Sequence, residues 1–262
     1  MAPLVPLTLV IIAKDEADRI GRAIASVPCA AEVLVLDSGS TDETVAEAEQ
    51  LGARVVQTDW PGFGPQKNRA WDLATQPWVL SLDADEWLDE AAAAAVQACV
   101  LADRPGAFRL QRHNLWCGRP VRGGAWGPSP KLRLARKPDA RWTDAHVHEV
   151  LQTSGPTTTL AGRLLHDPFR GPHEHLAQIS AYAALFVRES HRLGRRRSAL
   201  ALLTRPTLHI VKALLLRGGI RDGALGLLLA WLGAAEVALK WALLWQDPGK
   251  VGPGTGLASE PD

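Results

Sequence analysis

Three carboxylates fall within four residues of the segment SLDADEWLDE, at Asp83, Asp85 and Glu86. They follow the apolar run WVLSL, and like charges this close repel one another unless water or a cation surrounds them. In a regular strand Asp83 and Asp85 point to the same side with Cβ atoms about 7 Å apart, too far for both to ligate one ion directly unless the strand ends between them. The segment therefore predicts one direct metal ligand, Asp85, and one partner, Asp83, that reaches a ribose or a metal-bound water.

The metal that suits such a site is Mg²⁺ or Mn²⁺, which prefers hard oxygen ligands and takes few of them from the protein. Water and a diphosphate would complete its coordination, and its charge would offset the charge that develops on a leaving nucleoside diphosphate. The D-x-D spacing alone is weakly specific. Its position after a fourth apolar strand, downstream of Asp37, makes it a stronger indication.

Asp37 ends the apolar run EVLVLD and begins a polar turn, DSGSTDE. Ligands of open α/β sheets bind at the carboxyl ends of strands, so Asp37 is placed to hydrogen-bond a nucleoside. Ser40 and Glu43, three residues apart, predict a capping box for the next helix. The alternative is an ordinary capped turn in which Asp37 is solvated.

The elements that must position these residues alternate along the first 110 residues. Short Val-, Ile- and Leu-rich runs are expected to be strands, at 7–13, 32–37, 53–58 and 78–83, and the segments between them have helical period, at 16–27, 41–52, 65–75 and 89–102. Apolar strands each followed by a helix indicate a parallel sheet in an α/β sandwich. The turn after the first run reads AKDEAD instead of G-x-G-x-x-G, which disfavours a dinucleotide cofactor.

The rest of the chain changes character twice. Residues 108–152 read as shorter strands and loops that could close the carboxyl edge of the sheet, and from about residue 160 onward the pattern is helical. We therefore expect a catalytic domain at 1–160, a helical extension at 161–247 and a Gly/Pro-rich disordered tail at 248–262. With 47% hydrophobic and 22% charged residues in 262, the composition is that of a globular protein.

Charge and cysteine content narrow the functional classes. Lys and Arg minus Asp and Glu gives −4 for residues 1–162, +8 for 163–221 and −3 for 222–262. The basic segment indicates an anionic partner, with phosphate the usual candidate, and no nucleic acid is expected. Three cysteines without C-x-x-C spacing indicate neither a disulfide framework nor a zinc site, and they fit a reducing compartment. The apolar N-terminus lacks a basic region and reads as a strand, not a signal peptide.

The helical region combines apolar helices, several tryptophans and the cluster Arg195-Arg196-Arg197. Its longest uncharged stretch, from Gly223 to Ala235, has 13 residues, short of the roughly 20 that span a bilayer. This pattern predicts a peripheral protein that lies on an anionic membrane surface. The alternative is a helical hairpin packed on the catalytic domain with solvated arginines.

The segments LTLVIIAKDEADRI, EVLVLDSGSTDETVAEAEQLGARV and GFGPQKNRAWDLATQPWVLSLDADE resemble the family 2 inverting glycosyltransferases. More narrowly, the chain resembles their lipopolysaccharide core-biosynthesis branch, with hexosyl- and heptosyltransferring members. The resemblance is strong over the first 90 residues and weaker through GGAWGPSPKLRLARK, HVHEVL and GGIRDGALGLLLAW. It implies a GT-A fold, a Rossmann-like nucleotide-sugar-binding α/β/α sandwich, here with a C-terminal helical extension.

The resemblance assigns the donor side of the site residue by residue. AKDE matches the family's nucleotide-contacting stretch, so it places Ala13 and Glu16 there, although the family usually has Asn where this chain has Asp15. Asp37 falls where the family's second-strand Asp contacts the nucleobase or ribose. In the QKN-like helix start, Lys67 and Arg69 could approach the diphosphate.

The same comparison places Asp83 and Asp85 on the family's D-x-D and Glu149 in its V-H-E motif. A downstream carboxylate is needed to take the proton of the acceptor hydroxyl, so Glu149 is predicted to be the catalytic base, with Asp144 as the substitute. His148, or His146, could add a metal or phosphate contact. The alternative is that these two histidines merely alternate on a half-exposed strand.

One departure concerns Ser129, where many relatives are expected to be acidic, which weakens any inference about acceptor contacts from Gly124 to Lys131. A zinc site at His166 and the His173/His175 pair is not expected, because such a pair beside prolines is more typical of surface or acceptor contacts.

Together these features predict a metal-dependent inverting glycosyltransferase at the cytoplasmic face of the inner membrane. It would take a nucleotide-sugar donor and a lipid-linked or lipopolysaccharide-core acceptor. The rival hypotheses are a nucleotidyltransferase, which would need a Gly- and Lys/Arg-rich phosphate loop where this chain has AKDEADR, and a non-catalytic nucleotide-sugar-binding or membrane-scaffold protein.

Overall fold

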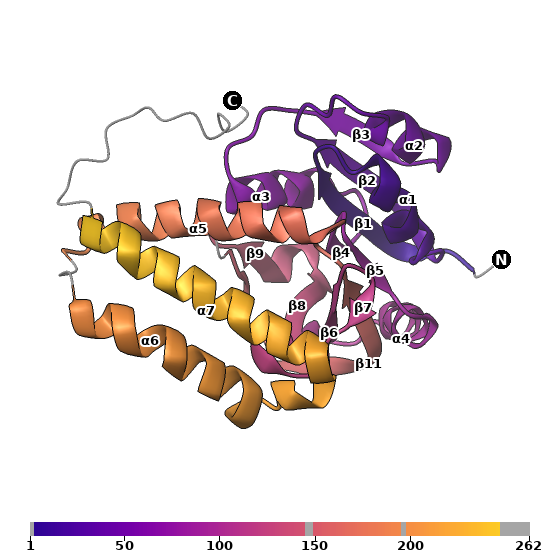
Figure 1. Cartoon of the computed structure of the whole chain (residues 1–262). Helices are drawn as coiled ribbons and strands as arrows, with labels where there is room; N and C mark the ends of the chain where they lie inside the picture. Colours follow the sequence, from indigo (N-terminus) through magenta and orange to yellow (C-terminus); the bar gives the residue numbers. More distant parts are fainter. Residues whose placement is uncertain (1–2, 145–148, 195–197, 247–262) are drawn as a thin grey trace. The chain divides into compact units, whose positions relative to one another are not determined.

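The computed structural model describes residues 3–144, 149–194 and 198–246 (Figure 1). The chain divides into two compact units. Among the described residues, unit 1 comprises 3–112, 129–144 and 149–166, and unit 2 comprises 113–128, 167–194 and 198–246. The predicted tail at 248–262 lies outside the described residues.

The first half of unit 1 is the predicted alternation of strands and helices. Its strands are β1 (Val5–Ala13), β2 (Ala30–Asp37), β3 (Arg54–Gln57) and β4 (Trp78–Asp83), and its helices are α1 (Ala17–Ala25), α2 (Thr44–Gln50), α3 (Phe63–Leu73) and α4 (Glu90–Leu101). β1 pairs in parallel with β2 on one side and with β4 on the other, and β2 pairs in parallel with β3. Buried Val, Ile and Leu on both faces of β1 favour this central position.

The second half of unit 1 extends the sheet with antiparallel pairs. Its strands are β5 (Glu86–Leu88), β6 (Ala107–Trp116, whose last residues belong to unit 2), β8 (Ser129–Arg136) and β11 (Thr157–His166), and a separate hairpin joins β9 (Ala140–Trp142) to β10 (Leu151–Thr153). The sheet order is β3-β2-β1-β4-β8-β6-β11-β5. β8 runs antiparallel to β4 and β6, and β11 antiparallel to β5.

The last strand of unit 1 crosses the end predicted for the catalytic domain. The predicted domain boundary at residue 160 falls inside β11, a ten-residue strand whose Gly162 has φ +83°. A Cβ on Gly162 would lie 2.1 Å from the backbone nitrogen of Ala92 on α4, so the strand can pack against the helix only at a glycine. Glu86, the last carboxylate of the acidic segment, lies in β5, and Asp89 caps α4.

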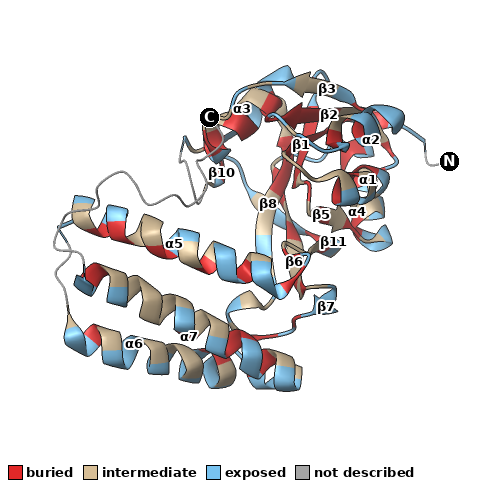
Figure 2. Ribbon diagram, turned by 45° about the horizontal axis from the view of Figure 1, so that its top comes forward, coloured by how far each residue is buried: buried red, intermediate tan, exposed pale blue. Residues whose placement is uncertain are grey.

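Two apolar cores cover the two faces of the sheet, which makes unit 1 the predicted α/β/α sandwich. On one face Leu9 and Ile11 pack with residues of α1, α2 and α4, among them Ile20. On the other face Val10 and Leu34 pack with α3 and the β9–β10 hairpin. Figure 2 shows the central strands mostly buried.

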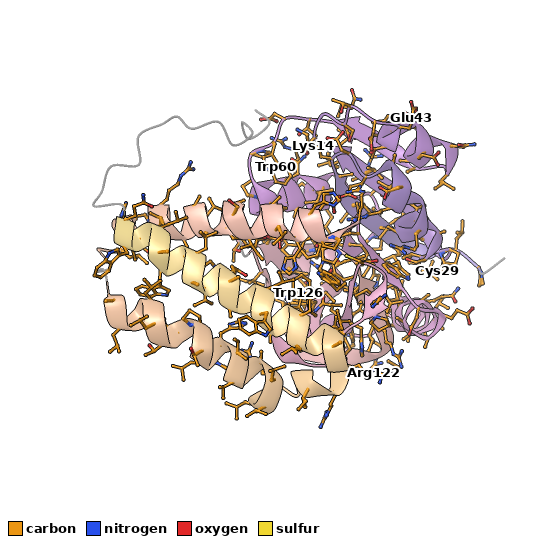
Figure 3. All side chains as sticks on the ribbon, in the orientation of Figure 1. Lys14, Cys29, Glu43, Trp60, Arg122 and Trp126 are labelled. Atoms are coloured by element: carbon orange, nitrogen blue, oxygen red, sulfur yellow. The ribbon has the colours of Figure 1, made fainter. Side chains whose placement is uncertain are left out.

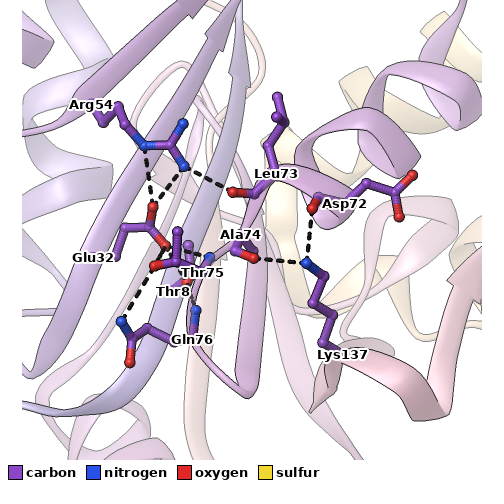
Figure 4. A network of polar contacts seen from close by, with 9 residues as sticks. All are labelled: Thr8, Glu32, Arg54, Asp72, Leu73, Ala74, Thr75, Gln76 and Lys137. Carbon is purple, nitrogen blue, oxygen red and sulfur yellow. Dashed lines mark hydrogen bonds and ion pairs between the residues drawn. The ribbon is translucent and has the colours of Figure 1, made fainter.

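A polar network at the amino edge of the sheet joins β1, β2 and the link from α3 to β4 (Figure 4). The Glu32 carboxylate accepts hydrogen bonds from the hydroxyls of Thr8 (2.6 Å) and Thr75 (2.7 Å) and from the Arg54 guanidinium (2.7 Å). Lys137 donates to the carbonyls of Asp72 and Ala74 at the end of α3, both at 2.8 Å. These bonds fix the end of α3, the helix that carries Lys67.

Unit 2 consists mainly of helices: α5 (Pro172–Arg192), α6 (Ala199–Val211), a π-helical turn at Lys212–Leu216, a 3-10 turn at Gly219–Asp222 and α7 (Gly223–Gln246). It also contains β7 (Arg119–Pro120) and a 3-10 turn at Gly124–Trp126. The remaining short turn, at Lys137–Asp139, belongs to unit 1. The helical prediction for this region is confirmed from residue 172 onward.

Aromatic and polar contacts hold unit 2 together. Trp126, labelled in Figure 3, lies with its ring 5.4 Å from Phe169 and 5.3 Å from His175. The Asp222 carboxylate accepts hydrogen bonds from the backbone nitrogens of Arg122 (3.0 Å) and Gly123 (2.9 Å). These bonds tie the two glycine-rich segments of the sequence, RGGAWG and GGIRDG, to each other.

Two helical segments of unit 2 are long and apolar enough to cross a membrane, Ala199–Leu216 with 18 residues and Gly219–Gln246 with 28. Only 11% and 22% of their most apolar windows are buried within the protein. The expectation that this region is too short to span a bilayer rested on its longest uncharged stretch, and the lengths of the helices contradict it. Length and composition alone do not establish that either segment spans.

Candidate functional site

The strand register brings the two predicted acidic positions to the same edge of the sheet. Ala13, the last residue of β1, pairs with Asp37 on β2, and Ile12 pairs with Asp83 on β4. Asp37 and Asp83 therefore flank the end of β1 from opposite sides. This is the edge at which open α/β sheets bind ligands.

Asp37 uses its carboxylate to build its own turn. The side chain is buried, its Oδ2 accepts hydrogen bonds from the backbone nitrogens of Gly39 and Ser40, both at 3.0 Å, and its Oδ1 accepts one from the Ser40 hydroxyl. The predicted capping box of Ser40 and Glu43 does not form, because Asp42 accepts from the backbone nitrogen of Thr44 (3.0 Å) at the start of α2. The nucleoside contact of Asp37 stays a prediction.

The AKDE turn after β1 is locked to the turn after β2. Asp15 has φ +53°, in the left-handed region that Asn and Asp tolerate better than most residues. Its carboxylate accepts hydrogen bonds from the backbone nitrogen (2.7 Å) and hydroxyl (3.1 Å) of Thr41, and its own nitrogen donates to the Ser40 hydroxyl at 2.9 Å. The Glu16 nitrogen donates to the Thr44 hydroxyl at 2.8 Å. Ala13 and Glu16 thus belong to a rigid edge, and their donor contacts stay predictions.

The strand that carries the acidic segment ends between its two aspartates. β4 ends at Asp83, a turn contains Ala84 and Asp85, and β5 begins at Glu86. The Asp85 carboxylate lies 3.4 Å from Nε2 of His166, the last residue of β11. Asp83 instead contacts Lys67 and Arg133, so the two aspartates have different surroundings.

Lys67 is the residue that connects the separate parts of the site. Its side chain is only 2% exposed, and its ammonium lies 2.8 Å from Oδ1 of Asp83 and 2.6 Å from Oε1 of Glu149. It also lies 4.7 Å from the centre of the Trp142 ring. The predicted base and the first aspartate of the D-x-D, 66 residues apart in sequence, therefore share one buried cation.

Arg69, predicted together with Lys67 to approach the diphosphate, is engaged elsewhere. Its guanidinium donates to Asp59 at 2.8 Å and to the Thr58 hydroxyl. Two residues apart on a helix, Lys67 and Arg69 leave α3 in directions about 200° apart. The contact of Arg69 with a diphosphate stays a prediction that no described contact supports.

Arg133 and Glu86 are site residues that sequence reasoning missed. The Arg133 guanidinium donates to Oε1 of Glu86 at 2.7 Å and to Oδ2 of Asp83 at 3.0 Å, and Glu86 is fully buried. The register of β6 and β8 shifts between Phe108 and Arg109, opposite Arg133, and such irregularities redirect a side chain. The alternating basic residues of KLRLARK were the available signal.

The two cations set the ionisation of Asp83. Burial alone would raise the pKa of this carboxyl, but the charges of Lys67 and Arg133 outweigh it and hold the pKa well below its ordinary value. Burial would conversely lower the pKa of Arg133, and the charges of Glu86 and Asp83 raise it. Asp83 is therefore a carboxylate at any physiological pH.

Asp85 and His166 offer a carboxylate oxygen and an imidazole nitrogen to a metal. Among residues 3–144, 149–194 and 198–246 no group of three or more His, Cys, Asp or Glu side chains is arranged to hold an ion. Mg²⁺ and Mn²⁺ often take only one or two ligands from the protein, so this donor set fits them, and Mn²⁺ also accepts imidazole. His146 and His148 lie outside the described residues.

His175 is built into the core of unit 2. It is 3% exposed, its Nδ1 accepts a hydrogen bond from Trp116 Nε1 at 3.1 Å, and it stacks on Phe169 at 4.5 Å. Burial lowers its pKa, so the imidazole is neutral at physiological pH. This places His175 in an aromatic cluster and not in an acceptor-contacting loop.

Comparison with known proteins matches the region that builds this edge. Residues 8–108 match the family model described as glycosyl transferase family 2. Over these residues the chain is similar to glycosyltransferase family 2. The match runs from β1 into the start of β6, so it includes Asp37, Lys67 and the D-x-D and ends before Glu149.

Similar proteins extend the likeness beyond this region. The chain is 28% identical over 254 residues to the lipopolysaccharide core biosynthesis glycosyltransferase LpsC of Rhizobium meliloti, covering 94% of each chain. It is 53% identical over 81 residues to an uncharacterized glycosyltransferase of Rickettsia felis, and this match covers 30% of this chain and 29% of that relative. The LpsC likeness therefore includes the C-terminal helices.

Among solved structures, the chain is similar to glucosyl-3-phosphoglycerate synthase from Mycobacterium tuberculosis in complex with Mn²⁺, uridine diphosphate and phosphoglyceric acid. The two are 25% identical, the likeness covers 43% of each chain, and the TM-score is 0.34.

Proposed function

We propose that this protein is an inverting, metal-dependent glycosyltransferase that moves a hexosyl or heptosyl group from a nucleotide sugar to a lipid-linked or lipopolysaccharide-core acceptor. The contact that carries the proposal is the bridge made by Lys67, whose ammonium holds both Asp83 and Glu149. The carboxylate expected on the donor side and the one expected to act as base thus belong to one polar centre.

In this reaction Glu149 accepts the proton of the acceptor hydroxyl while the hydroxyl oxygen bonds to the anomeric carbon. The bond from that carbon to the diphosphate oxygen breaks on the opposite face, and its electron pair leaves with the nucleoside diphosphate, which inverts the anomeric configuration. Asp144 is the weaker candidate for the base, because it is exposed and its described partner is the Asn68 amide at 3.1 Å.

Asp85 and His166 would hold Mg²⁺ or Mn²⁺, which when bound offsets the negative charge of the leaving diphosphate. The Asp83 carboxylate is taken up by Lys67 and Arg133, which supports Asp85 as the direct ligand and Asp83 as an orienting group. His148 remains a second proposed ligand.

The acceptor class and the location are proposed from the LpsC likeness and from unit 2. α6 and α7 expose leucines and Trp231, and Arg205, Lys212 and Arg217 lie on the same stretch of chain. Basic residues beside exposed apolar side chains favour an anionic lipid surface, each contributing on the order of 1 kcal/mol. We propose that the protein works at the cytoplasmic face of the inner membrane.

The base is tested by comparing Glu149→Gln with Asp144→Asn. A thermal-shift screen of UDP-, ADP-, GDP- and dTDP-sugars with Mn²⁺ first identifies the donor, and transfer to lipopolysaccharide-core acceptor is then measured. Glu149→Gln should lower kcat by about 10²–10⁴-fold while nucleotide affinity is kept, and Asp144→Asn should change kcat only slightly. Unchanged turnover of Glu149→Gln would remove this residue from the base role.

The metal ligand is tested with Asp85→Ala, which should lose both transfer and Mn²⁺-dependent binding of the nucleotide while its circular dichroism spectrum and melting temperature stay near those of the parent. Full turnover of this variant with Mg²⁺ or Mn²⁺ contradicts the assignment. Failure of every nucleotide sugar to bind would instead favour a protein without transferase activity.

A further inference from the structure

Within the part of the chain that the structure describes, Lys131 is a cation without a carboxylate partner near the polar centre formed by Lys67, Asp83, Glu86, Arg133 and Glu149. Asp83, Glu86 and Glu149 are each within ion-pair distance of at least one of Lys67, Arg112 and Arg133. Three negative side chains thus face three positive ones. Among the described residues, the ammonium of Lys131 makes neither a hydrogen bond nor an ion pair.

The surroundings of Lys131 are unfavourable for its charge. The side chain is half-buried on β8. Burial lowers the pKa of its ammonium, and the neighbouring charges of Arg112 and Arg133 lower it further, against a smaller opposite effect of Glu86 and Asp83. Keeping a half-buried ammonium charged next to two arginines costs free energy, and a bound anion would lower that cost.

Arg112 is also incompletely bonded. Its closest described carboxylate is Glu86, with Nη1 to Oε1 at 3.7 Å, beyond hydrogen-bond length. Its Nε is buried and has no acceptor among the described residues. The fork of Arg112 therefore retains donors that could bind an oxyanion.

The strand register places these two cations together. Arg112 on β6 pairs with Ser129 on β8, and Leu110 pairs with Lys131. Paired residues point to the same side of a sheet, and so do residues two apart on one strand, so Arg112 and Lys131 project from the same face as diagonal neighbours. Arg133 connects this face to Asp83 through its 3.0 Å hydrogen bond.

We propose that Arg112 and Lys131 form an oxyanion subsite that binds a phosphate group of a substrate beside the D-x-D. A planar guanidinium fork and a lysine point charge together match a phosphate, which carries several acceptor oxygens and up to two charges. The identity of the phosphate rests on the proposed function, since it belongs either to the diphosphate of the donor or to a phosphorylated sugar of the acceptor.

The experiment compares Lys131→Gln and Arg112→Gln with Arg136→Gln, which removes one positive charge from the end of the same strand β8, where Arg136 pairs with Asp103. Calorimetry measures the binding of UDP and ADP, of pyrophosphate, and of glucose 6-phosphate to each full-length variant. Lys131→Gln should melt no lower than the parent, because the ammonium it removes has no partner.

Loss of one charge-assisted contact should weaken binding about tenfold or more. If Lys131→Gln and Arg112→Gln weaken the nucleoside diphosphates and pyrophosphate, the subsite holds the donor. If they weaken only glucose 6-phosphate, it holds the acceptor. Lys131→Arg should keep the affinity in either case.

The subsite is overturned if both variants bind every probe as tightly as Arg136→Gln does. This outcome is separate from failure of the proposed function. Phosphate binding that depends on Lys131, in a protein that transfers no sugar, would keep the subsite and reject the transferase. Sugar transfer with all phosphate affinities unchanged would do the reverse.

Discussion

The carboxyl edge of the sheet in unit 1 and the helices α6 and α7 of unit 2 differ in what they bury and what they expose. The edge buries charge: Lys67 is 2% exposed, Arg133 5% and Glu86 not at all. The helices expose apolar side chains: Leu203 of α6 is 73% exposed and Trp231 of α7 is 61% exposed. Figure 2 shows the same contrast between the buried strands and the exposed or intermediate residues of these helices.

Both arrangements cost free energy in an isolated chain. Charges taken out of water must find opposite charges, and large apolar patches left in water forgo the stabilisation that burial would give. Unit 1 answers its cost internally, because Lys67 and Arg133 pair with Asp83 and Arg133 also pairs with Glu86. Asp85 is the residue proposed to bind a metal, and Arg112 and Lys131 are those proposed to bind a phosphate. The described residues of unit 2 leave most of the apolar surface of α6 uncovered, with Ala201 its only buried residue. The first arrangement agrees with the proposed metal and phosphate sites, and the second with the proposed contact between unit 2 and a membrane surface.

Lys67→Met is the sharpest way to break the first half of this contrast. It leaves Asp83 and Glu149 facing each other without their shared ammonium, so the free energy of unfolding should fall by about 3–5 kcal/mol. Urea unfolding followed by circular dichroism measures this. Arg69→Met, on the same helix α3, is the matched control and should cost at most about 1 kcal/mol, since its pair with Asp59 is exposed. Equal losses in the two variants would mean that the centre is not held together by Lys67.

The second half of the contrast is tested at Leu203 and Leu216. Burying one exposed leucine side chain in lipid contributes about 1.5–3 kcal/mol, and substitution by Gln removes this contribution. Partition of each variant onto vesicles of phosphatidylethanolamine and phosphatidylglycerol should therefore weaken roughly tenfold to a hundredfold. Co-sedimentation measures the partition. Leu101→Gln, at a 62% exposed leucine of α4 in unit 1, should leave it unchanged. If Leu203→Gln and Leu216→Gln both bind vesicles as strongly as the parent, a membrane role for this surface is contradicted.

A smaller effect is expected at Glu32, on the amino edge of the same sheet. Burial would raise the pKa of this carboxyl, but hydrogen bonds from Thr8, Arg54 and Thr75 lower it from 4.5 to about 2. The pKa is thus lower in the folded chain than in the unfolded one. The stability gained is complete above about pH 4.5 and is lost as the pH falls toward 2.

Glu32→Gln should therefore lower the free energy of unfolding at pH 7 by roughly 1–2 kcal/mol, a value reduced because Arg54 is 43% exposed and water screens the pair. The difference between the parent and the variant should shrink below about pH 4.5, as urea unfolding at several pH values would show. A difference that stays constant down to about pH 2 would indicate that Glu32 acts through packing alone.

The parallel half of the fold could be predicted from the sequence because its signals are local. Continuous apolar runs such as LTLVIIA and EVLVLD can hardly be anything but buried strands, and the helices between them repeat with their own period. The position of Asp83 at a strand end followed directly. β11 was missed because its sequence, TTTLAGRLLH, becomes a strand through pairing with β5 and close approach to α4 at Gly162.

What the sequence by itself determined is the α/β order, the D-x-D at the carboxyl edge and the resemblance to family 2 glycosyltransferases. Only the tertiary structure decided which charges meet. Lys67, predicted to approach a diphosphate, lies between Asp83 and Glu149, and Arg133 contacts Glu86. The reason is physical. Helix and strand periods act over a few residues, whereas these ion pairs join positions 16 to 82 residues apart. Whether such charges lie within 3 Å depends on strand register and on how α3 packs, and neither is encoded in any short segment.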